Sequence, residues 1–383
     1  MFSGRSGLDR RENRLSQALR ARRRQGRETI DLTCANPTEL GLTPAPELLA
    51  TLADRAALRY RPEPRGLHRA RCSVAELMSR DGPPVDPERI VLTASTSEAY
   101  GFLFKLLCDP GERVLIPRPS YPLFEHLCRL ESVEPAPYPL RYDGHWYVDR
   151  AALAAAIDGR ARALVMVHPN NPTGSYVCRD DLRYLAAAGP PLISDEVFAP
   201  YALERDANAA GSAREAEDRL AFTLHGLSKL AGLPQLKLSW ICVSGPDAQV
   251  AEALGRLELI ADAFLSVSTP VQLATPAIVE QHGQLQRRIL ERLRDNHGAL
   301  RRACADSPCT LLRVEGGWSA VLRLPATMDD EAWSLQLLEQ ADVLVQPGYF
   351  YDFERGPFVV LSLLTEPTTW RAGIDRVFDA IEG

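Results

Sequence analysis

The chain has 383 residues, of which 45% are hydrophobic, and its formal net charge is −6. Chains of this length split more often into two domains than they form one. The net negative charge gives no electrostatic footprint for nucleic acid, and no run of about 20 apolar residues is present to span a membrane. We therefore expect a protein without nucleic-acid or membrane partners.

Eight cysteines are scattered singly, without a C-x-x-C pair and without histidines at the spacing of zinc ligands. This pattern is typical of reduced thiols in a cytoplasmic enzyme, and it predicts no metal site. The first 28 residues are rich in arginine but lack the apolar core of a secretory signal. Acidic residues interleave with these arginines, which favours a charged N-terminal arm over a transit peptide.

From about residue 89 the sequence alternates β-rich runs with helical stretches. The β-rich runs are almost continuously apolar, as in strands that are buried on both faces of a parallel sheet. They lie at 89–95, 113–117, 161–169, 191–198 and 221–228. We expect an α/β domain with a mostly parallel sheet over residues 41–270.

After residue 246 the pattern changes to two long helices, predicted at 248–264 and 271–303. The tail then alternates strands and helices. We expect residues 271–383 to form a smaller α+β domain, which the N-terminal arm of residues 1–40 joins. The polar segment 205–218 is predicted to be a solvated surface loop.

Polar residues stand where several of the apolar runs stop. Ligands of open α/β sheets lie outside the carboxyl ends of the strands, so these residues are candidates for a site. Each has an ordinary interpretation: hydroxyls before a helix form an N-cap, an asparagine lies in a turn, a buried carboxylate pairs with an arginine, and a lysine lies on the surface. The functional alternatives are an anion site at the helix start, a carboxylate that needs a cation, and a desolvated amine that can form a Schiff base. The candidates are Ser95, Thr96, Ser97, Asn171, Asp195 and Lys229.

The order of these motifs is more specific than any one of them. The hydroxyl turn, N-N-P-T-G, D-E-V-F and S-K-L-A-G-L-P follow one another, and this set resembles the class I and II aminotransferases, pyridoxal-phosphate enzymes of fold type I. The likeness runs from about Tyr60 to Gly348. It implies that Lys229 forms the Schiff base with pyridoxal 5'-phosphate and then moves the substrate's proton, and that Asp195 keeps the ring nitrogen protonated.

The resemblance also implies how the rest of the cofactor is held. Tyr121 matches the aromatic residue that stacks on the ring, and Asn171 matches the donor to the phenolic oxygen. Tyr60 matches a tyrosine that reaches the phosphate from the neighbouring subunit, which implies a homodimer with shared active sites. The full set of implied cofactor-binding residues is Tyr60, Ser95, Thr96, Ser97, Tyr121, Asn171, Asp195, Phe198, Ser228, Lys229 and Lys237.

Four positions depart from the family's pattern. Gly226 stands where the family has a serine that binds the phosphate. Phe198 stands where the family usually has a tyrosine, so one donor to the phenolic oxygen is absent unless Tyr201 supplies it. Lys237 stands where the family has an arginine, and an ammonium group cannot make the bidentate contact of a guanidinium. Val360 stands where an arginine typically binds the substrate carboxylate, a contact worth ~1.5–3 kcal/mol. Either another group binds the carboxylate or the substrate lacks one there.

Several residues are candidates to line the substrate mouth. For each arginine among them, a surface ion pair is the ordinary alternative. Asn36 and Phe350 match segments that line the mouth in the family. The arginine candidates are Arg65, Arg69, Arg118 and Arg323.

The sequence therefore predicts an aminotransferase that moves an amino group between an amino acid, or an amine, and a 2-oxo acid. A lyase, a cyclase or an oxidase that uses the same Cα carbanion is the alternative within enzymes, because the departures change how the substrate is held. The alternative outside enzymes is a binding module that keeps the fold without turnover, and no feature of the sequence favours it.

Overall fold

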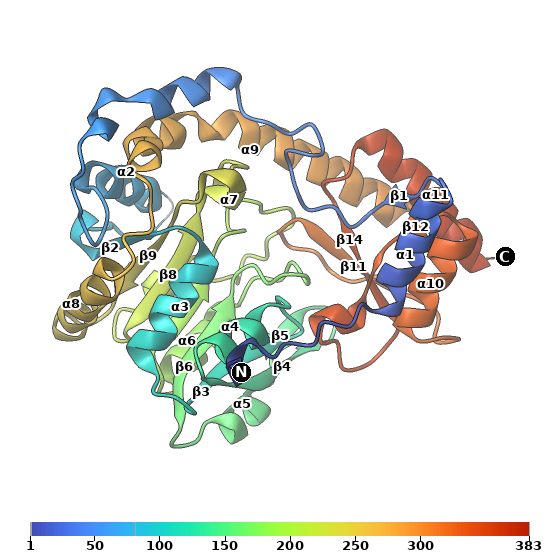
Figure 1. Cartoon of the computed structure of the whole chain (residues 1–383). Coiled ribbons are helices and arrows are strands. Elements are labelled where there is room, and N and C mark those ends of the chain that lie inside the picture. Colours follow the sequence, from blue (N-terminus) through green and yellow to red (C-terminus); the bar gives the residue numbers. More distant parts are fainter. Residues whose placement is uncertain (1, 81, 383) are drawn as a thin grey trace.

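The computed structural model describes residues 2–80 and 82–382 (Figure 1). A large α/β part holds the long sheet, and a smaller part holds a four-stranded sheet with helices around it. The 36-residue helix α9 (Thr269–Cys304) joins them, packing against α2 (His68–Ser79) in the large part and α11 (Pro367–Glu382) in the small part. The domain boundary predicted at residues 270 and 271 lies in the first turn of α9.

The large sheet has eight strands in the order β2-β9-β8-β7-β6-β3-β4-β5. Neighbours from β8 to β4 pair in parallel, whereas β9 and β5 are antiparallel to theirs. The mostly parallel α/β sheet expected from the sequence is thus confirmed. The strands are β2 (Ile90–Thr93), β3 (Arg113–Arg118), β4 (Glu134–Tyr142), β5 (Trp146–Val148), β6 (Ala161–Val167), β7 (Leu192–Asp195), β8 (Ala221–Gly226) and β9 (Ser239–Ser244).

Helices cover both faces of this sheet, which is why its central strands are apolar on both sides. Val114 of β3 packs in the layer beneath α3 and α8, while its neighbour Leu115 packs in the opposite layer beneath α5 and α6. Successive side chains of a strand point to opposite faces, so both layers draw on every central strand. The helices are α3 (Thr96–Leu107), α4 (Phe124–Leu130), α5 (Arg150–Ala156), α6 (Arg179–Ala187) and α8 (Asp247–Asp262).

The hairpin of β4 and β5 was not expected from the sequence. Proline is depleted in strands, yet β4 contains Pro135, Pro137 and Pro139. These prolines alternate, so their missing N–H groups all fall on one side of the strand. The other side of β4 pairs with every residue of β3. On the proline side, β5 pairs only with the last three residues of β4, Leu140 to Tyr142. The edge of the sheet therefore tolerates the prolines.

The small part is built around a four-stranded sheet in the order β10-β11-β14-β13. Its core packs this sheet against the second half of α9 and against α11, with Trp318, Trp333 and Trp370 among the largest buried side chains. The remaining elements are β10 (Thr310–Leu311), β11 (Ser319–Arg323), α10 (Asp330–Gln340), β12 (Val343–Leu344), β13 (Gln346–Pro347) and β14 (Phe358–Ser362).

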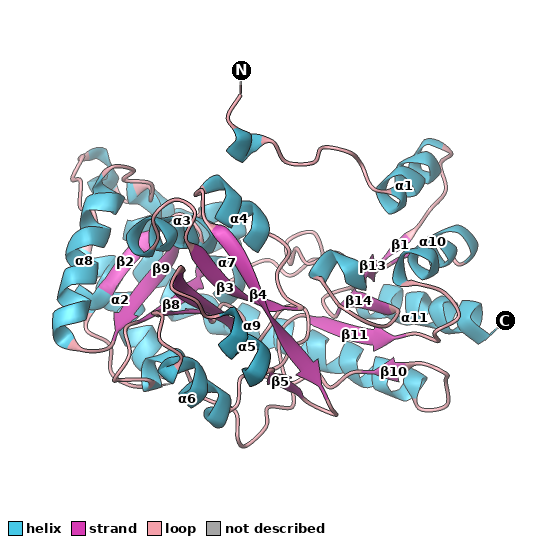
Figure 2. Ribbon diagram, turned by 90° about the horizontal axis from the view of Figure 1, so that it is seen from below, coloured by secondary structure: helices cyan, strands magenta, loops and turns pink. Residues whose placement is uncertain are grey.

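The N-terminal arm packs mainly against the small part. Helix α1 (Arg14–Arg24) lies on α10, where Arg14 forms an ion pair of 3.0 Å with Glu331, and β1 (Ile30–Asp31) pairs in parallel with β12. The first residues then reach the large part, where the guanidinium of Arg129 in α4 donates to the carbonyl of Gly4 at 3.1 Å. Figure 2 shows this arm passing from α1 toward α4.

The segment 205–218 is only partly the solvated loop that was predicted. Its centre is buried because it satisfies the carboxylate of Glu196, which accepts hydrogen bonds from Ser212 Oγ (2.8 Å) and the N–H of Ala213 (2.8 Å). The buried guanidinium of Arg214 lies close by and donates to backbone carbonyls of residues 78 and 83. A polar composition alone did not reveal this partner.

In the part of the chain that the structure describes, no helix is both long and apolar enough to cross a bilayer. All eight cysteines are free thiols, and Cys128, Cys242 and Cys309 are the most deeply buried.

Candidate active site

The candidate site lies where the parallel strands of the large sheet end. β3, β6, β7 and β8 are consecutive parallel neighbours, so their carboxyl ends meet at one edge. Directly at or after these ends stand Tyr121, Asn171, Asp195 and Lys229. Residues from four separate stretches of the chain are thereby brought to the same edge of the sheet, as expected from the sequence.

Asp195 is the last residue of β7, and its side chain is buried. Its carboxylate accepts hydrogen bonds from the N–H of Val197 (3.2 Å) and from the hydroxyl of Tyr100 (3.2 Å). Burial raises its pKa to about 6, although the two hydrogen bonds and the charge of Lys229 act in the opposite direction. Among the described residues no cation lies within 4 Å of this carboxylate. A cationic ligand, such as a protonated ring nitrogen, would stabilise its charged form.

Lys229 lies in the one-turn helix α7 (Leu227–Leu230) that follows β8. Its Nζ atom lies 5.5 Å from the centre of the Phe198 ring and 5.0 Å from that of Trp318. Within residues 2–80 and 82–382 this amine has no hydrogen-bond or ion-pair partner. Burial lowers the pKa of Lys229, and the charge of Asp195 partly offsets that shift. A lysine in this setting more readily carries the neutral, nucleophilic amine.

Phe198 and Tyr201 both lie near Lys229, but neither presents a free hydroxyl. The Phe198 ring meets Trp318 edge to face, with centroids 5.3 Å apart. The hydroxyl of Tyr201 donates to the backbone carbonyl of Lys229 at 2.5 Å. Because that hydroxyl already holds the main chain, the structure does not support Tyr201 as a replacement for the tyrosine missing at position 198.

The hydroxyl turn stands at the start of α3. Ser95 is its N-cap, and its Oγ accepts the N–H of Glu98 at 3.1 Å. The ordinary interpretation of Ser95 therefore holds at least in part. Thr96 and Ser97 are half-buried in the first turn, where backbone N–H groups lack intrahelical partners and favour an anion.

Ser228 and Lys237 lie on either side of Lys229 in the sequence, in the segment that connects β8 to β9. Ser228 is half-buried, directly before Lys229. Lys237 is exposed and adopts a left-handed backbone conformation, with φ 54°, just before β9. Its ammonium group is accessible to an anion, and its role beside a phosphate stays a prediction.

The two adjacent asparagines of the N-N-P-T-G motif have different environments. Asn170 is buried and structural, since its amide donates to the carbonyl of Pro119 (3.0 Å) and to Thr173 Oγ1 (2.9 Å), and its oxygen accepts from Ser120 (2.8 Å). Asn171 is half-buried, and its side chain makes no hydrogen bond within the described residues. Asn171 is thus the one of the pair that can bind a ligand.

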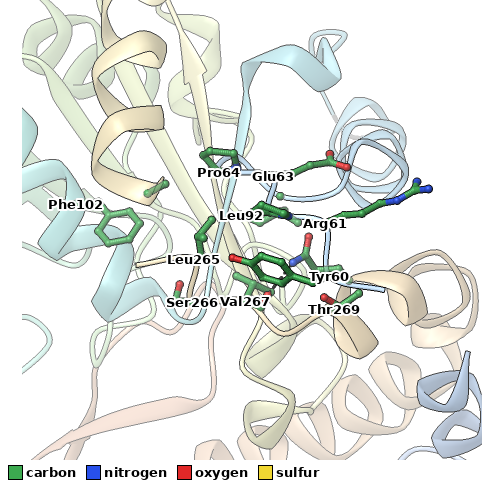
Figure 3. Close-up of a pocket in the computed structure, with 14 residues that line it drawn as sticks. Tyr60, Arg61, Glu63, Pro64, Leu92, Phe102, Leu265, Ser266, Val267 and Thr269 are labelled. Atoms are coloured by element: carbon green, nitrogen blue, oxygen red, sulfur yellow. Dashed lines mark hydrogen bonds between the residues drawn. The ribbon is translucent and has the colours of Figure 1, made fainter. Parts of the chain in front are cut away.

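The two predicted aromatic contacts lie in different places. Tyr121 is half-buried. Its burial and the charge of the nearby Asp195 carboxylate both raise the pKa of its phenol. Tyr60 is 81% exposed and lines a surface pocket with Leu92, Phe102 and Leu265 (Figure 3). Among the described residues no contact brings Tyr60 to Lys229, and its role across a subunit boundary stays a prediction.

Val360 is buried in an apolar cluster. On β14 it pairs with Val321 of β11, and it is 2% exposed. The cluster also contains Leu312 and Tyr351 and is bordered by Tyr142, Trp146, Phe350, Phe353 and Phe358. The backbone of Tyr351 accepts the N–H of Ser120, next to Tyr121, so this cluster borders the cofactor-side residues. The position is therefore filled by a buried apolar side chain among apolar neighbours.

The arginine candidates are mostly engaged elsewhere. Arg65 pairs with Glu88 (2.9 Å) and Glu258 (3.2 Å). Arg118 pairs with Glu125 and, at 3.3 Å, with Asp352. Neither guanidinium is therefore free in this structure, and their roles toward a substrate stay predictions.

The other substrate-mouth candidates also have contacts of their own. Arg69 is exposed on α2, and Arg323 lies exposed on β11 and donates to Thr310 at 3.3 Å. Asn36 donates to Glu39 at 3.0 Å. Phe350 stacks edge to face on Tyr349, with centroids 4.8 Å apart.

Sequence reasoning missed two residues that contact the candidate site. Trp318, which follows two glycines, covers the Lys229 amine, and its buried indole N–H has no hydrogen-bond partner in the described part of the chain. Tyr100 lies inside α3 and donates to Asp195. A tryptophan after Gly-Gly was the only signal for Trp318. Tyr100 carried no signal at all, because its position fits the ordinary apolar face of a helix.

The side chains present fit pyridoxal 5'-phosphate. Lys229 offers an unpaired amine for its aldehyde, Asp195 a buried carboxylate for its ring nitrogen, and Tyr121 an aromatic face. The half-buried turn at Thr96 and Ser97 offers N–H and hydroxyl donors for its phosphate. The orphaned indole N–H of Trp318 beside the amine is also consistent with a bound ligand, because buried polar groups are normally hydrogen-bonded.

Comparison with solved structures shows the same fold. Alanine aminotransferase from Pyrococcus furiosus superposes with a TM-score of 0.89 at 20% identity, covering 100% of both chains. A double mutant of Thermus thermophilus aspartate aminotransferase superposes with a TM-score of 0.85 at 23% identity, covering 99% of each chain.

Sequence comparison identifies the family. Alanine aminotransferase of Mycobacterium tuberculosis is 28% identical over 306 residues, which cover 77% of this chain and 71% of that protein. An S-alkyl-thiohydroximate lyase of Arabidopsis thaliana is 30% identical over 223 residues, 56% of this chain, and the match spans about half (48%) of the lyase. The family profile described as aminotransferase class I and II matches residues 28–366. The chain therefore belongs to the class I and II aminotransferases, a family of pyridoxal-phosphate-dependent enzymes.

Proposed function

We propose that this class I and II aminotransferase moves an amino group between an amino acid, or an amine, and a 2-oxo acid, with Lys229 as the amine that bonds the cofactor. One observation carries the proposal. Lys229 Nζ is desolvated between Phe198 and Trp318, has no partner among the described residues, and lies close enough to Asp195 for their charges to interact. Structural lysines rarely occupy such a setting, because burying an unpaired ammonium group is costly.

Each residue of the site would bind a different part of the cofactor. Asp195 would bind the ring nitrogen, Tyr121 would cover a ring face, and Asn171 would donate to the phenolic oxygen. The turn of Ser95, Thr96 and Ser97 binds the phosphate, with Ser228 and Lys237 at its other side. When bound, pyridoxal 5'-phosphate supplies an aldehyde carbon and a ring that accepts electron density from the substrate's Cα.

Lys229 then acts as the base. With the cofactor bound and Lys229 free of it, the neutral amine would take the proton from the substrate Cα and could return it to the carbon that derives from the cofactor's aldehyde. The rings of Phe198 and Trp318 exclude water from this amine, which keeps its pKa low and its proton transfer directed. Tyr201 holds the backbone carbonyl of Lys229, and so fixes the position of the one-turn helix.

The apolar cluster around Val360 favours a substrate that presents an uncharged group to it, and we refer to this cluster as the apolar wall. A carboxylate placed against Val360, Val321 and Leu312 would be desolvated without a cation, at a cost of several kcal/mol. An apolar or aromatic group would instead gain about 25 cal/mol for each Å² buried. We therefore propose an amino donor whose carboxylate, if it has one, is bound away from Val360.

A homodimer is proposed from the exposed apolar surface around Tyr60. Tyr60, Leu58, Leu259 and Phe264 are between 53% and 86% exposed, and Tyr60 and Leu265 line the pocket of Figure 3. A second copy would cover this surface and let Tyr60 reach the partner's phosphate site. A cytoplasmic location also stays a prediction, which the eight free cysteines support.

Mixing two inactive variants tests the shared site. Tyr60→Ala and Lys229→Ala are each expected to be weakly active or inactive alone. If Tyr60 acts across the interface, a mixed dimer has one site with both residues intact, and activity returns. If Tyr60 acts within its own chain or not at all, mixing restores nothing.

The reaction itself is tested with the purified holoenzyme and a panel of amino acids and amines. A transaminase given a donor alone loses its visible cofactor absorbance within one turnover and releases one equivalent of a carbonyl product, and a 2-oxo acid restores the absorbance. A lyase keeps turning over without an acceptor and regains its absorbance unaided. Failure of every donor to change the spectrum would contradict both.

A further inference from the structure

The hydroxyl of Tyr100 is a direct neighbour of the proposed ring-nitrogen partner. Tyr100 lies in α3, is 1% exposed, and donates to Asp195 Oδ2 at 3.2 Å. The only other hydrogen bond that this carboxylate accepts among residues 2–80 and 82–382 comes from the N–H of Val197, also at 3.2 Å. Tyr100 is therefore the one side chain that fixes the carboxylate.

The ring of Tyr100 is itself held by aromatic packing. It meets the Phe124 ring edge to face, at 5.2 Å and 85°. Phe124 in turn meets Tyr121 edge to face, at 5.9 Å and 88°, and the Phe104 ring centroid lies 5.9 Å from that of Tyr100. An aromatic row thus connects the predicted ring-stacking residue, Tyr121, to the predicted ring-nitrogen partner, Asp195.

We propose that Tyr100 is a positioning residue, which keeps the Asp195 carboxylate charged and aimed at the cofactor's ring nitrogen. The inference rests on the proposed function, since it needs a cationic nitrogen at Asp195. A donated hydrogen bond stabilises the charged form of a carboxylate, and a ring clamped by Phe124 fixes the direction of that bond. Without the hydroxyl, one carboxylate oxygen would be buried with no donor.

Other groups around the carboxylate do not take over this task. The amine of Lys229 lies beyond ion-pair distance, and in the proposed enzyme it is bonded to the cofactor. The Tyr121 phenol makes no hydrogen bond to Asp195. The N–H of Val197 holds only Oδ1. Tyr100 alone therefore determines where Oδ2 points.

Tyr138 offers a matched control. It is also 1% exposed, but its hydroxyl donates to a backbone carbonyl, that of Val165, at 2.7 Å. Tyr138→Phe therefore removes a buried hydroxyl and one hydrogen bond without touching Asp195. Any effect that Tyr100→Phe has beyond that of Tyr138→Phe comes from its particular partner.

The test compares two cofactors. Dissociation constants are measured for pyridoxal 5'-phosphate and for its 1-deaza analogue, in which a carbon replaces the ring nitrogen, with wild type, Tyr100→Phe and Tyr138→Phe. We expect Tyr100→Phe to bind pyridoxal 5'-phosphate about tenfold more weakly, which corresponds to about one unit in the pKa of Asp195. It should bind the deaza analogue as wild type does, and Tyr138→Phe should match wild type with both.

Two results would overturn the inference: unchanged affinity of Tyr100→Phe for the normal cofactor, or an equal loss for both cofactors, which would mean a merely structural role. If Tyr100→Phe does not fold, Tyr100→Leu removes the same hydroxyl and is measured in its place. Wild type that binds neither cofactor would instead refute the proposed function.

Discussion

The amine of Lys229 lies 5.0 Å from the centre of the Trp318 ring, and this contact links the large sheet to the small one. Lys229 follows β8, whereas Trp318 immediately precedes β11. The environment of the lysine therefore depends on how the two parts of the chain pack together.

Trp318→Ala should raise the pKa of Lys229 toward its ordinary value, because water would replace the ring that desolvates the amine. The measurement is the pH dependence of Lys229 acylation in the apoenzyme, read by mass spectrometry. The chain contains two other lysines, Lys105 and Lys237, which serve as internal controls and should not change. An unchanged Lys229 profile would show that Trp318 does not control its protonation.

Asp195→Asn should reduce kcat by about tenfold to a hundredfold or more, because the amide keeps the shape and loses the charge, a difference of about 1.5–3 kcal/mol. The adjacent buried carboxylate gives the control. Glu196→Gln disturbs hydrogen bonds to Ser212 and Ala213, so it should lower the melting temperature with little effect on the cofactor spectrum. If the two variants exchanged these effects, the assignment of the two carboxylates would be wrong.

The raised pKa of Asp195 predicts a pH effect on the stability of the apoenzyme. The pKa of Asp195 is about 6 in the folded chain, against an ordinary value of 3.8 that applies to the unfolded chain. Between pH 3.8 and pH 6 the folded state therefore binds more protons than the unfolded state. Stability therefore rises as pH falls through about 6, and the gain levels off below about 3.8. Unfolding of wild type relative to Asp195→Asn should become more costly by on the order of 2–3 kcal/mol between pH 7.5 and pH 4. A constant difference would contradict a buried, unpaired carboxylate.

Val360→Arg should destabilise the fold by about 3 kcal/mol or more, because a guanidinium would enter a cluster without an acidic partner. Thermal unfolding measures this, with the exposed Arg323→Ala as a variant that should be nearly neutral. On a panel of donors, wild type should prefer those that present an apolar group, and Val360→Arg should shift kcat/KM toward donors with a carboxylate and away from amines that lack one. A wild-type preference for dicarboxylic donors would contradict the apolar wall.

Much of the fold was predictable because short sequence patterns specify individual strands and helices. The continuous apolar runs predicted the central strands β3, β6, β7 and β8, and the first run became the edge strand β2. The helical stretch expected after that run is α3. The β4–β5 hairpin was not predictable, since Pro135, Pro137 and Pro139 lower strand propensity and only the edge position tolerates them.

The positions of Asp195 and Lys229 at the edge of the sheet were predictable, because each stands at or shortly after the end of a strand. The site was not predictable where the function of a residue depends on a distant partner. Trp318 lies 89 positions from Lys229 in sequence, and Tyr100 lies 95 positions from Asp195. Nothing near either residue in the sequence identifies these partners, and the same holds for the hydroxyl of Tyr201.

The most direct measurement is borohydride reduction of the holoenzyme, followed by digestion and mass spectrometry of the lysine-containing peptides. The chain has only three lysines, and Lys105 is ion-paired with Glu131 while Lys237 is exposed, so the assignment is unambiguous. We predict a pyridoxyl group on Lys229 alone. A holoenzyme that carries no adduct, or carries it on Lys105 or Lys237, would contradict the account.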